Sequence, residues 1–104
     1  MSVEQVNAEQ FAALLKSGQP IIVDLYADWC GPCKMIAPEV VKMAAANPSV
    51  KVVKIDVDAE EELTETLGVS AMPTFLAFDK TGKEVDRVQG ANKVAIAAAF
   101  AKVA

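Results

Sequence analysis

The sequence predicts an α/β domain in which a central mixed five-stranded sheet is flanked by four helices. Strand-like and helix-like segments alternate up to about residue 69, which is typical of parallel strands joined by helical crossovers. Beyond that point two short strand-like runs are separated by five residues, which favours an antiparallel hairpin. The 104 residues suffice for one domain, 1–104, with a single apolar core.

The first elements are predicted from caps and apolar patterning. Residues 3–6 form a short strand-like run. A helix is predicted over 7–18, because Asn7 is a suitable N-cap and Gly18 a suitable stop. The run 21–27 is apolar at nearly every position, as expected of a central strand covered on both faces.

The middle of the chain repeats this alternation. Residues 34–46 are helix-like and include Pro38, which is expected to kink the helix. Residues 50–57 predict a second buried strand. The next helix is expected to begin at Asp58, with an acidic residue three positions later as in a capping box, and to end at Gly68.

The chain closes with a predicted hairpin and a helix. Residues 74–78 and 84–88 are strand-like, and the five residues between them are rich in turn formers. An alanine-rich helix follows. Its large apolar residues, all expected to pack on the sheet, are Val94, Ile96, Phe100 and Val103.

Composition and charge exclude several classes of function. A net charge of -4 leaves no basic surface for nucleic acid, and no apolar run is long enough to span a membrane. The chain has two cysteines and no histidine, so it lacks the ligands of a tetrahedral zinc site and the base of a cysteine protease. The N-terminus has no basic region followed by an apolar stretch, so a cytosolic protein is expected.

The two cysteines, Cys30 and Cys33, stand where the strand-like run 21–27 meets the helix-like run 34–46. Unpaired N–H groups and the positive end of the helix dipole favour a thiolate at Cys30, which is expected to be the reactive sulfur. Pro32 suits an early helical position, where its missing N–H costs nothing. A structural disulfide closing so small a loop would stabilise the fold little, so a redox-active pair is expected rather than a structural bridge or two inert core thiols.

The residues around this pair resemble the active site of the thioredoxin family. The matching segments, in the family's order, are Val23-Asp24, Trp29-Cys30-Gly31-Pro32-Cys33-Lys34, Met35-Ile36-Ala37-Pro38, Ala71-Met72-Pro73-Thr74 and Gly90-Ala91-Asn92. The resemblance implies the thioredoxin fold, no bound cofactor, and reduction of disulfides in client proteins. It also implies re-reduction by an NADPH-dependent thioredoxin reductase. Family-typical clients are peroxiredoxin, methionine sulfoxide reductase and ribonucleotide reductase.

Two charged residues are candidates for proton handling. Cys30 is expected to attack a client disulfide and Cys33 to resolve the mixed disulfide. Burial raises the pKa of an unpaired carboxylate, so Asp24 is expected to accept a proton from Cys33, as the resemblance also implies. The alternative is a strand aspartate that reaches solvent. Lys54 is either the charge partner of Asp24, as the resemblance implies, or a strand lysine that extends into water.

A flat, weakly polar rim around Cys30 is expected to bind clients, and its members are Trp29, Gly31, Pro32, Met72, Gly90 and Ala91. The resemblance implies a cis peptide bond before Pro73, packing of Pro73 against the cysteines, and pairing of the Met72 backbone with an extended client segment. Sequence alone leaves alternatives open. Most prolines are trans, Trp29 can be a core residue, and Gly90 can simply mark the boundary between a strand and a helix.

Two rival functions follow from the same features. Isomerases typically carry Gly-His and glutaredoxins Pro-Tyr between the cysteines, so Gly31-Pro32 disfavours both. A binding module, whose cysteines act only as a switch, is the rival from another class. Because no cysteine lies outside the pair, a disulfide-linked dimer is not expected and the chain is predicted to be a monomer.

Overall fold

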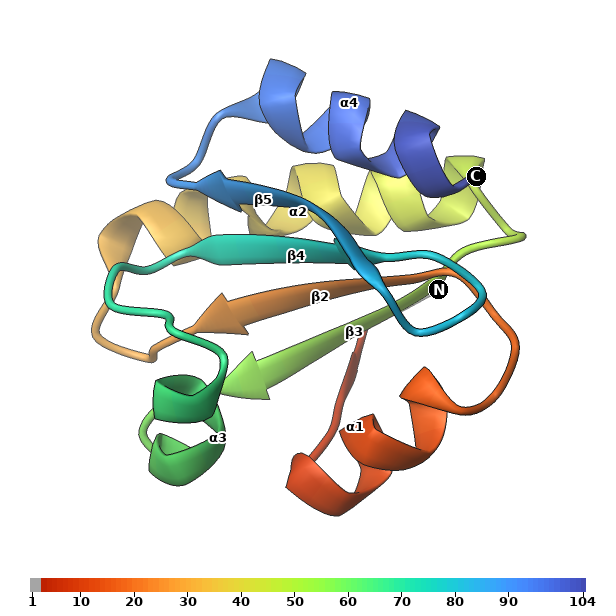
Figure 1. Ribbon diagram of the computed structural model, residues 1–104. Helices are drawn as coiled ribbons and strands as arrows, with labels where there is room; N and C mark the ends of the chain where they lie inside the picture. The colour runs from red at the N-terminus through yellow and green to blue at the C-terminus, as the bar shows by residue number, and fades with distance from the viewer. Residues whose placement is uncertain (1–2) are drawn as a thin grey trace.

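The computed structural model describes residues 3–104, so the expectations that involve Met1 and Ser2 lie outside it. Five strands form one mixed sheet in the order β1-β3-β2-β4-β5. Helices α2 and α4 cover one face of this sheet, and α1 and α3 cover the other (Figure 1). The predicted fold class is therefore confirmed. The elements are β1 (Glu4–Gln5), α1 (Ala8–Leu15), β2 (Ile21–Tyr26), α2 (Gly31–Ala46), β3 (Lys51–Asp56), α3 (Glu61–Thr66), β4 (Thr74–Phe78), β5 (Glu84–Gln89) and α4 (Lys93–Val103).

Strand β2 lies at the centre of the sheet and sends apolar side chains to both faces. It pairs in parallel with β3 and antiparallel with β4. Ile21 and Val23 join the core on the side of α1, whereas Ile22 joins the core on the side of α2 and α4. Alternate side chains of a strand point to opposite faces, so a strand covered on both sides is apolar throughout. The prediction for residues 21–27 is confirmed, with the strand ending one residue earlier.

The last two strands form the predicted antiparallel hairpin. The Asp79 carboxylate accepts hydrogen bonds from the backbone N–H groups of Thr81, at 2.9 Å, and Lys83, at 3.2 Å. Gly82 has φ +86°, and a Cβ there would lie 2.7 Å from the carbonyl oxygen of Leu15. Only glycine fits both constraints, which fixes the turn that joins β4 to β5.

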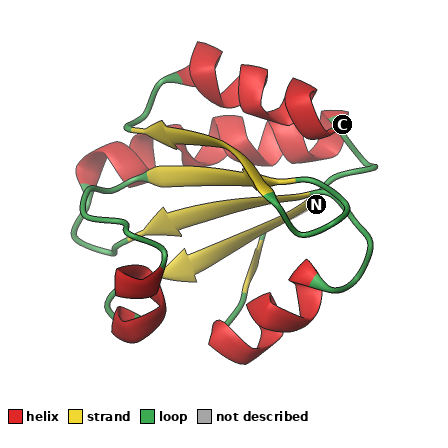
Figure 2. Cartoon of the chain, in the orientation of Figure 1, coloured by secondary structure: helices red, strands yellow, loops and turns green. Residues whose placement is uncertain are grey.

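One end of the sheet gathers the segments that carry the conspicuous motifs. Strands β2 and β3 end there, and α2 and β4 begin there, so their loops lie together (Figure 2). Residues 27–30 come from the first of these loops and residues 70–73 from the loop that leads to β4. Across residues 3–104 no helix has both the length and the apolar character that a membrane crossing requires.

Two predicted details are wrong. Helix α3 begins at Glu61 rather than at Asp58, and Glu60, its N-cap residue, makes no side-chain capping bond. A turn intervenes, because the backbone N–H groups of Ala59 and Glu60 both bond to the carbonyl oxygen of Asp56. In α4, Val94 is 80% exposed and does not pack on the sheet.

The position of Val94 follows from helical geometry. The buried residues of α4 are Ile96, Ala99 and Phe100, which lie on one stripe of the helix. Val94 precedes Ile96 by two positions, which places it roughly 200° around the helix and away from the sheet.

The two faces of α4 predict very different mutational effects. Phe100→Ala empties a buried site and should lower the free energy of unfolding by about 3–5 kcal/mol. Val94→Ala removes a solvated side chain and should change it by less than about 0.5 kcal/mol. Urea unfolding followed by circular dichroism measures both variants against the native chain. A loss at Val94 comparable to that at Phe100 would contradict this placement of α4.

Candidate active site

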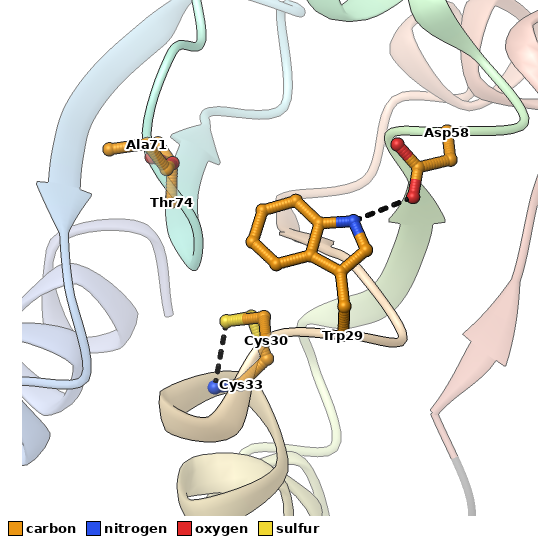
Figure 3. Close-up of a disulfide and its surroundings, with 6 residues drawn as sticks. All are labelled: Trp29, Cys30, Cys33, Asp58, Ala71 and Thr74. Atoms are coloured by element: carbon orange, nitrogen blue, oxygen red, sulfur yellow. Dashed lines mark hydrogen bonds between the residues drawn. A yellow bond between two sulfur atoms is a disulfide. The ribbon is translucent and has the colours of Figure 1, made fainter.

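The cysteine pair occupies the first turn of α2. Cys30 is the N-cap residue, Cys33 lies three positions further on, and a disulfide joins them with 5.3 Å between their Cα atoms. The backbone N–H of Cys33 donates a hydrogen bond to Sγ of Cys30 at 3.1 Å (Figure 3). Both residues are buried, with 4% and 6% of their surface exposed. The predicted position at the helix start is confirmed, although the helix begins at Gly31, before the predicted residue 34.

This placement has a chemical consequence for Cys30. The backbone N–H groups of a first helical turn have no partner within the helix, and the end of the helix dipole is positive there. A donor directed at Sγ of Cys30 stabilises negative charge on that sulfur when the disulfide is open. Pro32 stands at one of the first two helical positions, where it gives up no hydrogen bond. The turn can therefore hold a thiolate at Cys30.

Asp24 lies beneath the same turn, on β2. Its side chain is buried, with 7% of the residue exposed, and Oδ1 has no hydrogen-bond partner. Burial raises the pKa of this carboxyl to about 7, while the positive charge of Lys54 partly counteracts the rise. The alternative of a solvated strand aspartate is thereby removed. Near neutral pH the group can both hold and release a proton.

A pocket of about 170 Å³ connects Asp24 with Cys33. Both residues line it, so water or a proton can pass between the carboxyl and the inner cysteine. The other charged or polar side chains that face this pocket are Tyr26, Asp28, Lys34 and Lys54.

Lys54 lies beside Asp24 without forming an ion pair with it. The two residues are in register on β3 and β2. Among the described residues no ion pair within 4.0 Å joins them, and Nζ of Lys54 instead lies 5.2 Å from the ring centroid of Tyr26. Tyr26 is fixed in turn, because its hydroxyl donates a hydrogen bond to Oε1 of Gln5 at 2.8 Å. Lys54 acts on Asp24 through its field rather than through a hydrogen bond.

Trp29 stands at the surface next to the disulfide. It is 68% exposed, so the alternative of a core tryptophan is removed. Its Nε1–H donates a hydrogen bond to Oδ2 of Asp58 at 2.9 Å (Figure 3). Sequence patterning missed this contact, since Asp58 matched the pattern of a helix cap equally well. Nothing in the sequence separates a capping aspartate from one that binds an indole on another loop.

The loop before β4 forms a second part of the site. The Met72–Pro73 peptide bond is cis, as the resemblance implied. The carbonyl oxygen of Pro73 accepts a hydrogen bond from the backbone N–H of Gly90 at 2.8 Å, and Oγ1 of Thr74 donates to the carbonyl of Ala71 at 2.6 Å. Gly90 has φ +93°, a backbone conformation that residues other than glycine rarely adopt, which explains why this residue is a glycine.

The remaining rim residues come from the same end of the molecule. Met72 packs against the core that contains both cysteines, and Ala91 packs against the core on the opposite face. Gly31 and Pro32 are exposed. In residues 3–104 no three side chains of the metal-binding types gather into a possible metal site.

Comparison with known proteins places this geometry in a family. The family model described as "Thioredoxin" matches residues 2–102. The chain is 46% identical to thioredoxin-1 of Saccharomyces cerevisiae over 95 residues, which is 91% of each chain. It is also 46% identical over 86 residues to thioredoxin-2 of Pyricularia oryzae, but spans only 50% of that protein.

A solved structure shows the same fold. The crystal structure of oxidised mitochondrial thioredoxin 3 from Saccharomyces cerevisiae superposes with a TM-score of 0.90 at 35% identity, covering 97% of this chain and 95% of that one. The family model, which matches residues 2–102, includes the segments that carry the cysteine pair. The chain therefore belongs to the thioredoxin family, and its Cys30–Cys33 pair makes it a thiol-disulfide oxidoreductase that reduces protein disulfides.

Proposed function

We propose that the chain cycles between the Cys30–Cys33 disulfide and a dithiol, and that an NADPH-dependent thioredoxin reductase restores the dithiol. The observation that supports this most is the disulfide at the N-cap of α2, which shares a pocket with a carboxyl whose pKa burial raises to about 7. The helix start supplies a nucleophile and the carboxyl supplies a proton acceptor. Both are needed for a complete exchange reaction at neutral pH.

The first step is attack by the Cys30 thiolate on one sulfur of a client disulfide. A bond forms between Sγ of Cys30 and that sulfur, while the client's S–S bond breaks and its second sulfur leaves as a thiolate. The N–H of Cys33 at 3.1 Å favours the attacking thiolate. No electrons enter from outside, because one disulfide is exchanged for another.

The second step releases the client and depends on Cys33. The Cys33 thiol passes its proton to Asp24 across the pocket that both residues line, and its sulfur attacks Sγ of Cys30. The mixed disulfide breaks and the client leaves with two thiolates, so two electrons have passed from the dithiol to the client. In this scheme the charge of Lys54 limits the rise in the pKa of Asp24, so that part of the carboxyl population is ionised near neutral pH.

Clients are proposed to dock on the rim around Cys30. The exposed indole of Trp29 and the two residues between the cysteines offer a flat, weakly polar surface. The backbone of Met72 would pair with an extended client segment beside Pro73. Recognition through main-chain groups places little demand on the client's side chains, which suits a reductant with several clients.

We propose peroxiredoxin, methionine sulfoxide reductase and ribonucleotide reductase as candidate clients of this chain. A solved structure matched at TM-score 0.91 and 35% identity concerns thiol resolution in a yeast mitochondrial 1-Cys peroxiredoxin, which favours the first of these.

A dithiol of this kind works in a reducing compartment, and we propose the cytosol as its location. Both cysteines lie in the site, so we propose a monomer without disulfide-linked dimers.

Replacing the resolving sulfur tests the two-step scheme. Cys33→Ser keeps the attacking thiolate but removes the group that releases the client, so a covalent complex with insulin should accumulate and consumption of NADPH with thioredoxin reductase should stop. Non-reducing electrophoresis detects the complex. The Cys30→Ser, Cys33→Ser double variant is the control and should form none. Multiple turnovers by Cys33→Ser would contradict the assignment, and a double variant that keeps full biological function would favour the binding module.

Replacing the buried carboxyl tests proton transfer. Asp24→Asn should slow resolution by about 100-fold, the usual scale of general-base catalysis, and leave attack by Cys30 nearly unchanged. In the native chain the resolving rate should rise with pH until it levels off above about pH 7, because Asp24 accepts a proton only when ionised. Stopped-flow tryptophan fluorescence follows the two steps. Equal slowing of both steps would count against this role.

Stability provides the control for this variant. The folded pKa of Asp24, about 7, lies above the ordinary value of 3.8, so the folded chain binds the proton more tightly than the unfolded chain. The contribution of Asp24 to native stability should therefore fall by about 4 kcal/mol as the pH rises from about 4 to 7, and this contribution should be absent in Asp24→Asn. At about pH 8 the variant should be the more stable protein, so its slow resolution cannot result from unfolding.

A further inference from the structure

Arg87, on the edge strand β5, reaches across to the loop that leads from α3 to β4. Its Nη2 donates a hydrogen bond to the carbonyl oxygen of Leu67 at 2.7 Å, and Nη1 donates to the carbonyl of Gly68 at 3.1 Å. These carbonyls lie at the end of α3, where helical backbone acceptors lack partners. Backbone hydrogen bonds to α3 also hold residues 67–69, and the guanidinium adds a tie from the start of the loop to β5.

Glu84 holds this guanidinium in place. Its two carboxylate oxygens accept hydrogen bonds from Nε and Nη2 of Arg87, each at 3.0 Å. The Arg87 side chain is about one-third exposed, so the ion pair alone contributes little to stability. The contact with Glu84 orients the guanidinium group. Because this group is planar, binding one edge to a carboxylate points its remaining N–H donors in a fixed direction.

The far end of the same loop is also tied to the end of β5. The N–H of Gly90, three residues beyond Arg87, donates to the carbonyl of Pro73 at 2.8 Å. Between these two anchors the only further side-chain bond within the described loop runs from Thr74 to Ala71. Met72, which also packs against the core, and Pro73 thus lie between two anchors, Arg87 on β5 and Gly90 directly after it.

We propose that Arg87, oriented by Glu84, is a positioning residue that holds the loop of residues 67–74 in the conformation that binds an extended client. This inference rests on the proposed docking of clients at Met72. A loop that is already ordered loses less conformational freedom when a client binds, so the anchor lowers the cost of binding. A small disulfide reagent that reacts at Cys30 without pairing to Met72 does not use the anchor.

The test compares a protein disulfide with a small one. Arg87→Met removes the donors while keeping an apolar stem that covers the same surface. The matched control is Lys102→Met, which breaks the 3.1 Å ion pair to Asp86 on the same strand but lies on α4, away from the loop. The assays use the full chain with thioredoxin reductase and NADPH. Insulin is the protein substrate and 5,5′-dithiobis(2-nitrobenzoate) the small one.

For Arg87→Met the KM for insulin should rise about tenfold, the effect expected from losing hydrogen bonds to a charged group. Its kcat, and its rate with the small disulfide, should stay within about twofold of the native values. Amide hydrogen exchange should accelerate in residues 67–72 and nowhere in α2. Arg87→Lys, which keeps the charge but not the fork, should give an intermediate KM, and Lys102→Met should match the native chain.

An unchanged KM in a folded Arg87→Met variant would overturn the inference while leaving the proposed function intact. So would a lower melting temperature accompanied by native kinetics, since that is the result of a purely structural contact. Equal losses with insulin and with the small disulfide would also overturn it, because the defect would then lie at Cys30. If the native chain fails to reduce insulin, the proposed function fails, and the docking role of Arg87 fails with it.

Discussion

The first turn of α2 is the constraint on which the site depends. It makes Cys30 the N-cap and places Cys33 one turn inside the helix, so the two sulfurs differ in their surroundings although only two residues separate them. The outer sulfur receives a backbone N–H, and the inner one faces the pocket shared with Asp24. The proposed division of labour between nucleophile and resolving group rests on this difference between the two sulfurs.

The surrounding fold supports that turn from three directions. Central strand β2 runs beneath it and delivers Asp24 to the pocket. Trp29 is tied to the loop after β3 through Asp58, which keeps the indole beside the disulfide (Figure 3). The loop before β4 is held at Pro73 by Gly90, directly after β5, and at its start by Arg87 on β5. These contacts link segments that are distant in sequence and tie the rim to the sheet that carries it.

Asp24 shows a conflict between stability and chemistry. An ionised carboxylate with an unpartnered oxygen destabilises a folded core, and an apolar residue at this position of β2 would pack better. The raised pKa suits the proposed reaction, which moves a proton near neutral pH. Lys54 reduces the conflict without removing it, because its ammonium lies over Tyr26 rather than against the carboxylate.

The fold was predictable because its elements carry local signals. Asn7 and Gln10 form the capping box that begins α1, and the apolar run of β2 marks the centre of the sheet. The errors arose where local signals compete or weaken. Asp58 fitted a cap but binds Trp29, and the alanine-rich α4 offers so little contrast between its faces that Val94 was misplaced.

The functional residues were likewise predictable only where the local sequence marks them. Cys30, Cys33 and Asp24 were found because each is exceptional in its own segment of sequence. The rim residues came from resemblance to a family rather than from local patterning. Arg87 was missed altogether, since a single arginine on an edge strand gives no sign of the carbonyls that it binds in another loop. Contacts between segments distant in sequence leave no periodic pattern in the sequence from which they could be predicted.

The most direct measurement is the rate of alkylation of each sulfur in the reduced chain. Iodoacetamide reacts with thiolates, and peptide mass spectrometry assigns the modified cysteine. At about pH 7, Cys30 should be alkylated much faster than Cys33, because only its sulfur lies at the N-cap of α2. Equal rates, or faster modification of Cys33, would contradict the claim that the helix start selects the nucleophile.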